Sequence, residues 1–213
     1  MCAPLKVINS TSLFKIDSGK MDINGIENSF MFNLTTDEIQ TQLKKHEIIP
    51  DVIQTAPKNV LQVTYNTTSV RFGNEINATE TKLEPSHMEW PEDNEHHYTL
   101  IMTDPDVPNR TTHFEREWQN WVVVNIPGCK FKNGKVLTEY IPPLPEEDFG
   151  GVHRYVFLSY KQPRQNMTFN ETYVRIASYG LRGEFSTRKF AEKYSLGDPV
   201  AVNFFYLRWS FIV

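Results

Sequence analysis

The sequence contains few cysteines and no long apolar stretch, and both absences narrow its class. Its 213 residues include only Cys2 and Cys129, which are not in C-x-x-C spacing. Two such cysteines do not make a disulfide framework, so we expect two free thiols and a cytoplasmic protein. No apolar run reaches the roughly 18 residues of a transmembrane helix. Residues 1–20 also lack the continuous apolar core of a secretory signal.

Concentrated positive charge and catalytic motifs are missing too. The formal net charge is −4, and no dense basic block is present, which argues against nucleic acid as a main partner. There is no G-x-S-x-G, no P-loop, no G-x-G-x-x-G and no H-E-x-x-H. His87, His96 and His97 lack acidic or thiolate partners at metal spacing. We therefore expect no metal, no cofactor and no enzymatic activity.

Asparagine sequons give an opposing signal about the compartment. Seven are present, beginning at Asn9, Asn33, Asn66, Asn77, Asn109, Asn166 and Asn170. Some arise by chance in a chain rich in Asn and Thr, and a glycan on Asn109 would crowd the neighbouring Asp-Pro segment. We interpret most of them as unused and keep secretion as the alternative.

The chain divides into an irregular extension, residues 1–35, and one domain, residues 36–213. Thr36 is predicted to cap a helix in which Ile39 and Leu43 face inward. A second helix fits Ser186 to Tyr194, with Ser186 as its cap and Gly197 after its end.

Between these helices the residue period is that of strands. Alternating or continuous apolar residues predict strands over 60–65, 70–72, 87–90, 97–103, 118–126, 152–160 and 200–211. No β-α-β alternation is present. We therefore predict an all-β fold, an antiparallel sandwich of two packed sheets with peripheral helices.

Two segments carry polar side chains that can form a site. Asp104 and Asp106 follow a predicted strand, and Pro105 and Pro108 stiffen the turn. The two carboxylates can point to one side. The alternative is an acidic turn that is capped by its own side chains.

The second segment, Gly151-Val152-His153-Arg154-Tyr155, opens a predicted strand. Alternation puts His153 and Tyr155 on one side of it. A carboxylate beside the imidazole would fix its tautomer, and the pair would offer donors to a phosphate or carboxylate. The alternative is a half-buried histidine that is satisfied by backbone groups.

In this order the segments resemble the phosphatidylethanolamine-binding protein family, which includes the Raf kinase inhibitor proteins. The resemblance covers roughly residues 45–210 and is nearest to insect-type members. It is carried by residues 98–108, 116–118, 122–128 and 151–157, which read YTLIMTDPDVP, REW, VVVNIPG and GVHRYVF.

The resemblance implies a two-sheet antiparallel β-sandwich with a small anion pocket at one end. The family's pocket residues correspond here to Asp104, Pro105, Trp118, His153 and Tyr155. Family members bind phosphate-like groups, including a phospholipid headgroup, without known need for a metal. They act mainly as binding and regulatory proteins, and some restrain kinases or serine proteases. We expect a monomer of this kind.

Three departures from the family pattern concern this pocket. Asn120 stands where the family usually has histidine, and an amide cannot carry charge. The usual glycine-containing loop reads YIPPLPEE over residues 140–147, whose acidic residues would repel a phosphate. Many members continue into a helix that borders the pocket, whereas this chain ends at Val213. We expect weakened anion binding through Asp104, Asn120, His153 and Tyr155. The alternative is a protein-interaction module with a vestigial pocket.

Overall fold

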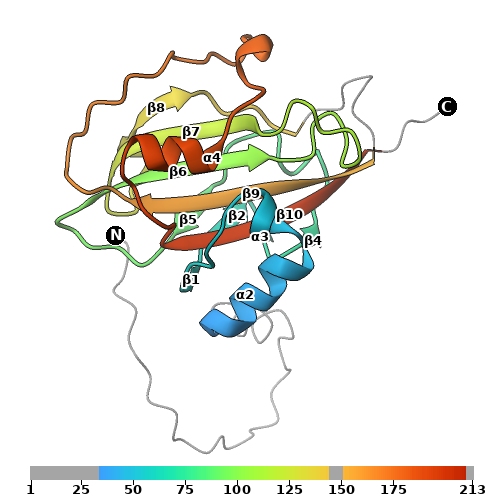
Figure 1. Cartoon of the computed structure of the whole chain (residues 1–213), viewed down its shortest axis with the longest axis horizontal. Coiled ribbons are helices and arrows are strands. Elements are labelled where there is room, and N and C mark those ends of the chain that lie inside the picture. The colour runs from blue at the N-terminus through green and yellow to red at the C-terminus, as the bar shows by residue number, and fades with distance from the viewer. Residues whose placement is uncertain (1–33, 144–150, 210–213) are drawn as a thin grey trace, which may run out of the picture.

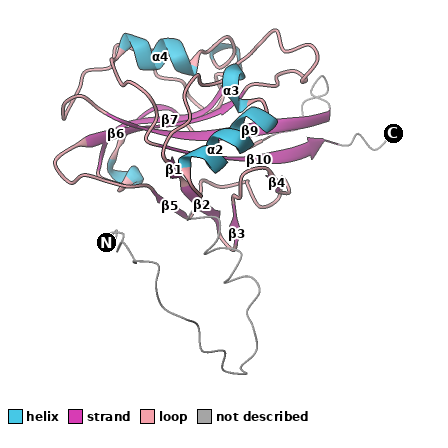
Figure 2. Ribbon diagram, turned by 60° about the horizontal axis from the view of Figure 1, so that its bottom comes forward, coloured by secondary structure: helices cyan, strands magenta, loops and turns pink. Residues whose placement is uncertain are grey.

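The computed structural model describes residues 34–143 and 151–209. These residues form a seven-stranded sheet in the order β1-β10-β9-β6-β7-β8, with β4 also paired to β10. A second sheet has the order β3-β2-β5. The α-helices lie on one side of the large sheet and the small sheet on the other (Figures 1 and 2). The predicted two-sheet β-sandwich with peripheral helices is confirmed.

The elements are short at the start of the domain and long in the centre of the large sheet. The helices are α2 (Thr36–Lys45), α3 (Ile48–Asp51) and α4 (Thr187–Lys193), with the 3-10 turns η1 (Phe131–Asn133) and η2 (Tyr179–Leu181). The strands are β1 (Asn59–Val60), β2 (Gln62–Tyr65), β3 (Thr68–Ser69), β4 (Asn74–Glu75), β5 (His87–Glu89), β6 (His97–Asp104), β7 (Trp118–Pro127), β8 (Lys135–Thr138), β9 (Gly151–Lys161) and β10 (Ala201–Trp209).

The alternation of side chains along β9 divides the interior into two cores. Val156 and Leu158 pack under the helices with Phe190 of α4. Tyr155 and Phe157 point the other way and pack against the small sheet. Because successive side chains of a strand face opposite sides, a strand buried on both sides reads as the near-continuous apolar run that the sequence contains.

Helix α2 begins as predicted, but its cap lies one residue earlier, at Thr35. The Glu38 N–H donates to Thr35 Oγ1 at 3.3 Å, and the Thr35 N–H donates to Glu38 Oε2 at 2.8 Å. This reciprocal capping box satisfies two backbone donors, which a cap at Thr36 would not do. The predicted second helix is confirmed as α4, with Ser186 at its N-cap.

The prediction of a strand over residues 70–72 is wrong, because this segment passes from one sheet to the other. The Val70 N–H donates to Val63 O in the small sheet at 2.9 Å, and the Gly73 N–H donates to Phe204 O in the large sheet at 2.8 Å. Asn203 holds the crossing, since its Oδ1 accepts from the Phe72 N–H at 2.9 Å. The short edge strand β8 was not predicted.

Cys129 is buried and disulfide-bonded. The expectation of two free thiols is therefore wrong. The chain's only other cysteine, Cys2, lies outside the described residues. Over residues 34–143 and 151–209, no helix has both the length and the apolar character needed to cross a bilayer.

Candidate functional site

A buried carboxylate and a buried imidazole meet where β6 ends and β9 begins. Asp104 Oδ2 accepts from Nδ1 of His153 at 2.7 Å, and both side chains are at most 3% exposed. Asp104 Oδ1 also accepts from the Asp106 N–H at 2.8 Å. Burial raises the pKa of the Asp104 carboxyl, and the charge and hydrogen bond of His153 offset part of that effect. The carboxylate thus orients the ring, as the segment pattern predicted.

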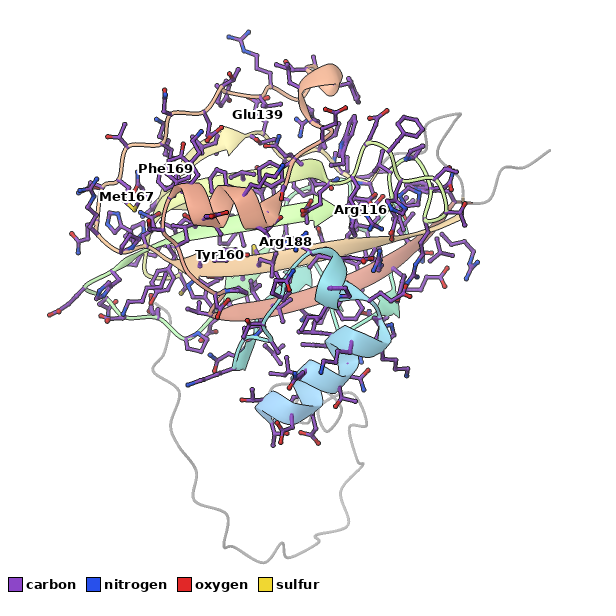
Figure 3. The ribbon with its side chains drawn as sticks, in the orientation of Figure 1. Arg116, Glu139, Tyr160, Met167, Phe169 and Arg188 are labelled. Atoms are coloured by element: carbon purple, nitrogen blue, oxygen red, sulfur yellow. The ribbon has the colours of Figure 1, made fainter. Side chains whose placement is uncertain are left out.

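Tyr155 and Trp118 flank this pair. The rings of His153 and Tyr155 are stacked, with centroids 6.4 Å apart. Burial, and then the charge of Asp104, raises the pKa of Tyr155 well above 10, so its hydroxyl stays a donor at neutral pH. Trp118 is directly opposite Asp104 in the β6–β7 ladder. Asp104, Trp118, His153 and Tyr155 thus lie at one end of the large sheet, the end at which Figure 3 labels Arg116.

Asn120 follows Trp118 on β7 and is 3% exposed. Its Nδ2 donates to the carbonyl of Ile141 at 3.3 Å, which fixes which way the amide points. Its Oδ1 is buried and has no hydrogen-bond partner among the described residues. A buried acceptor without a partner is costly. The residue that stands in place of the family's usual histidine is therefore set up to accept a hydrogen bond.

Pro105 is buried in the turn after β6, and the carbonyl of Pro105 accepts from Nε of Arg116 at 2.6 Å. The next carboxylate, Asp106, does not face the His153 side. Its Oδ2 accepts from the backbone N–H and the Nε of Arg154 at 3.0 and 2.8 Å. His153 and Arg154 are consecutive in β9, so their side chains lie on opposite faces of the sheet. Their partners, Asp104 and Asp106, therefore face opposite sides as well. The expectation of two carboxylates in one pocket is wrong for Asp106.

Glu117 is a third buried acid, after Asp104 and Asp106. Its carboxylate accepts from the backbone N–H and the hydroxyl of Thr187, at 3.0 and 2.5 Å. Burial raises its pKa from 4.5 to about 7. The bonds to Thr187 join β7 to the start of α4. No local sequence signal marks this role, because Thr187 lies 70 residues away.

Among the residues that the structure describes, no group of three or more His, Cys, Asp or Glu side chains is arranged to hold a metal ion. The hydrogen-bonding groups of the site are the imidazole of His153, the hydroxyl of Tyr155, which also interacts with Asp104 and Trp209, and the amide oxygen of Asn120. These are hydrogen-bonding groups with one titratable ring, which suits recognition of a small polar group.

These features define a class of protein, a β-sandwich that holds an oriented histidine at one end of its large sheet. Residues 53–205 match the family described as phosphatidylethanolamine-binding protein. The chain therefore belongs to this family, as the sequence segments indicated.

Three relatives illustrate the match. The "Putative odorant-binding protein A5" of Drosophila melanogaster is 35% identical over 175 residues, which cover 82% of each chain. The solved structure of a carboxypeptidase Y inhibitor, complexed with its cognate proteinase, is 28% identical with a TM-score of 0.69. It covers 82% of this chain and 97% of the inhibitor. The phosphatidylethanolamine-binding protein of Plasmodium vivax shares the fold, with 23% identity, a TM-score of 0.67 and coverage of 83% and 98%. These relatives carry names of binding and inhibitor proteins.

Proposed function

We propose that this chain is a non-enzymatic binding protein that recognises a phosphate-bearing group, such as a phospholipid headgroup. The proposed ligand site consists of Asp104, Pro105, Trp118, Asn120, His153 and Tyr155. The observation that carries the proposal is the 2.7 Å bond from His153 Nδ1 to Asp104. It holds the ring of His153 beside the hydroxyl-bearing ring of Tyr155, and a protonated imidazole is a charge-assisted donor to phosphate.

Asn120 narrows the class of ligand further. Its buried Oδ1 needs a donor, so a simple phosphate dianion would leave it unsatisfied. Turning the amide over would give up the bond from Nδ2 to Ile141 O. A ligand that carries both an anionic group and a donor satisfies both residues. In phosphorylethanolamine, the phosphate would accept from His153 and the ammonium would donate to Asn120 Oδ1. We therefore expect phosphorylethanolamine to bind more tightly than inorganic phosphate.

Isotope-edited NMR of the His153 ring tests this proposal. Titration with phosphorylethanolamine is expected to shift the His153 signals at millimolar ligand, and ethanolamine alone is expected to have a smaller effect. Asp104→Asn should weaken binding because the amide no longer fixes the charged form of the ring. His87, whose side chain is 56% exposed on β5, is the internal control. If His153 does not respond, or if His87 shifts equally, the proposed site is wrong.

The second candidate is a protein-interaction module whose pocket is vestigial, and the complete burial of His153 favours it. Inhibition of a kinase or serine protease through the protein surface belongs to this candidate. The carboxypeptidase Y inhibitor among the relatives supports a protease as the partner to test first. A purified serine carboxypeptidase, inhibited equally by the wild type and by Asp104→Asn, would favour this candidate over the first.

We further propose that the protein works in an oxidising compartment, contrary to the cytoplasmic expectation. Cys129 is disulfide-bonded, and such bonds persist mainly outside the cytosol. Four sequon asparagines are exposed, at Asn66, Asn77, Asn166 and Asn170. When it is fused to a secretory signal and expressed in insect cells, the chain should be exported to the medium with a mass that falls on treatment with an N-glycosidase. Retention in the cell with no change in mass would contradict this proposal.

A further inference from the structure

A cavity lies on the helix side of the large sheet, away from His153 and Tyr155. Its volume is about 220 Å³. Its apolar floor consists of Val122 of β7, Leu137 of β8 and Phe190 of α4, all buried in the core under the helices. His153 and Tyr155 are absent from its lining. It is therefore separate from the proposed headgroup site.

The mouth of this cavity is formed by the segment that runs back across β8 before α4. Glu171, Thr172 and Leu181 line it and are exposed. The segment is tied to the neighbouring strands at two points, Ile176 and Arg182. Glu139 accepts from the Ile176 N–H at 2.7 Å, and Arg182 donates to the carbonyl of Gln119 at 2.8 Å. Figure 3 labels Glu139 between β8 and this segment. These bonds hold the opening in place, so the cavity is a formed feature and not a gap beside a free loop.

Charged ligands do not suit this cavity. The carboxylate of Glu171 is already taken, because its Oε1 accepts from Lys193 Nζ and from the Tyr194 hydroxyl, both at 2.6 Å. Apart from Glu171, every lining side chain is uncharged. Burying a charge among such residues without a partner is unfavourable. The occupant that the lining favours is therefore neutral and mainly apolar.

One polar group does point to a specific contact. Gln119 Oε1 accepts from the Thr138 hydroxyl at 2.9 Å, which fixes the orientation of the amide. Its Nε2 then reaches only the carbonyl of Leu181, at a long 3.4 Å. A bond of this length is weak, so the donor is available to a better acceptor. Gln119 thus offers an N–H to a ligand in this cavity.

We propose that this cavity binds a small neutral molecule with one ring or a short branched chain and a single carbonyl or hydroxyl oxygen. An engineered apolar cavity of about 150 Å³ holds benzene. The space of about 220 Å³ then accommodates about nine non-hydrogen atoms by the same scaling. Val122, Leu137 and Phe190 pack against the hydrocarbon part, and Gln119 Nε2 donates to the oxygen.

Acetophenone and α-methylstyrene test this assignment as a matched pair, because they differ by a carbonyl oxygen in place of a methylene. In methyl NMR of the wild-type protein, both are expected to shift Val122 and Leu137, while Val63 on the small-sheet side stays unchanged. Both should still bind when the protein is saturated with phosphorylethanolamine, which separates this site from the proposed headgroup site.

Two variants identify the contacts. Gln119→Leu should lower the affinity for acetophenone relative to α-methylstyrene by about two- to tenfold, the range expected for one hydrogen bond. Leu137→Phe should fill the cavity and abolish binding of both, whereas Leu83→Phe, at a 79% exposed residue, should not. Leu137→Phe also perturbs the packing of the core. The methyl shifts of Val122 and Leu137 in the wild-type protein are therefore the deciding measurement. No shift of Val122 and Leu137 up to the solubility limit, or an unchanged affinity ratio in Gln119→Leu, would overturn the proposal.

Discussion

Arg154 encloses the carboxylate of Asp106 in the interior of the protein. Its Nε donates to Asp106 Oδ2 at 2.8 Å and its Nη2 to Asp106 Oδ1 at 2.5 Å, and both side chains are fully buried. The other donors reach Asp51 Oδ2 and the carbonyls of His46 and Glu47, at 2.8, 3.0 and 2.8 Å. One side chain thus joins the Asp-Pro turn, β9 and the connection between α2 and α3. It stabilises the turn from the face opposite His153.

Replacing Arg154 with methionine should lower the free energy of unfolding by about 3–5 kcal/mol. The substitution removes the hydrogen-bonded charged partner of a buried carboxylate, which is the costly way to break a buried ion pair, and leaves Asp106 with the more distant Arg116 Nη2, at 3.7 Å. Burial alone would raise the pKa of Asp106, but the hydrogen bonds and charge of Arg154 outweigh it and lower that pKa. Urea denaturation at neutral pH measures the loss.

The matched control for this prediction is Arg208→Met. The Arg208 side chain is 59% exposed and its Nε lies 3.3 Å from Glu75 Oε1. An exposed pair of this kind contributes at most about 1 kcal/mol. Equal losses in the two variants would show that Arg154 has no special role.

Asn120→His, which restores the residue usual in the family, should strengthen phosphate binding by about five- to tenfold. The reason is that a charged imidazole donates a strong hydrogen bond to phosphate, whereas the unpartnered amide oxygen of Asn120 can only accept one. The gain should be present below the ordinary histidine pKa of about 6.5 and be lost above it. Calorimetry at one pH below and one pH above about 6.5 measures the gain in phosphate affinity. Gln119→His places the same ring on the other face of β7, and an equal gain there would indicate nonspecific attraction.

Glu117 should make the protein less stable as the pH rises toward neutrality. Its pKa is raised by burial from 4.5 to about 7. As the pH rises, Glu117 therefore loses its proton in the unfolded chain before it does so in the folded protein. The free energy of unfolding falls between pH 4.5 and about pH 7 and is level above that range. The shift corresponds to about 3 kcal/mol in total. Thermal unfolding of Glu117→Gln across this range should show a flatter pH profile, while the exposed variant Glu184→Gln should match the wild type.

Reduction of the disulfide at Cys129 should destabilise the protein by about 2–4 kcal/mol, the usual range for a native disulfide. Denaturation with and without a thiol reductant measures the change. Denatured but unreduced protein should take up no iodoacetamide. Labelling of the unreduced chain would mean that the cysteine is a free thiol.

Most long elements could be predicted from local patterns. β6, β7 and β9 are largely apolar or alternating runs, and α4 has a clear cap at Ser186. The segment over residues 70–72 could not be predicted, because its β-branched and aromatic residues fit a strand while its backbone is divided between two sheets. The edge strand β8 is short and carries few apolar residues, so its pairing depends on β7 and not on its own sequence.

The sequence by itself determined the class of fold, the family and the facing of His153 and Tyr155, because the period of two along a strand is a local property. Only the tertiary structure decided the partners. Asp104 meets His153 across 49 residues, Asp106 meets Arg154 on the opposite face, and Glu117 meets Thr187 across 70 residues. Such contacts depend on how sheets and helices pack, and so does the cavity beside Gln119. Spacing along the chain does not contain that information.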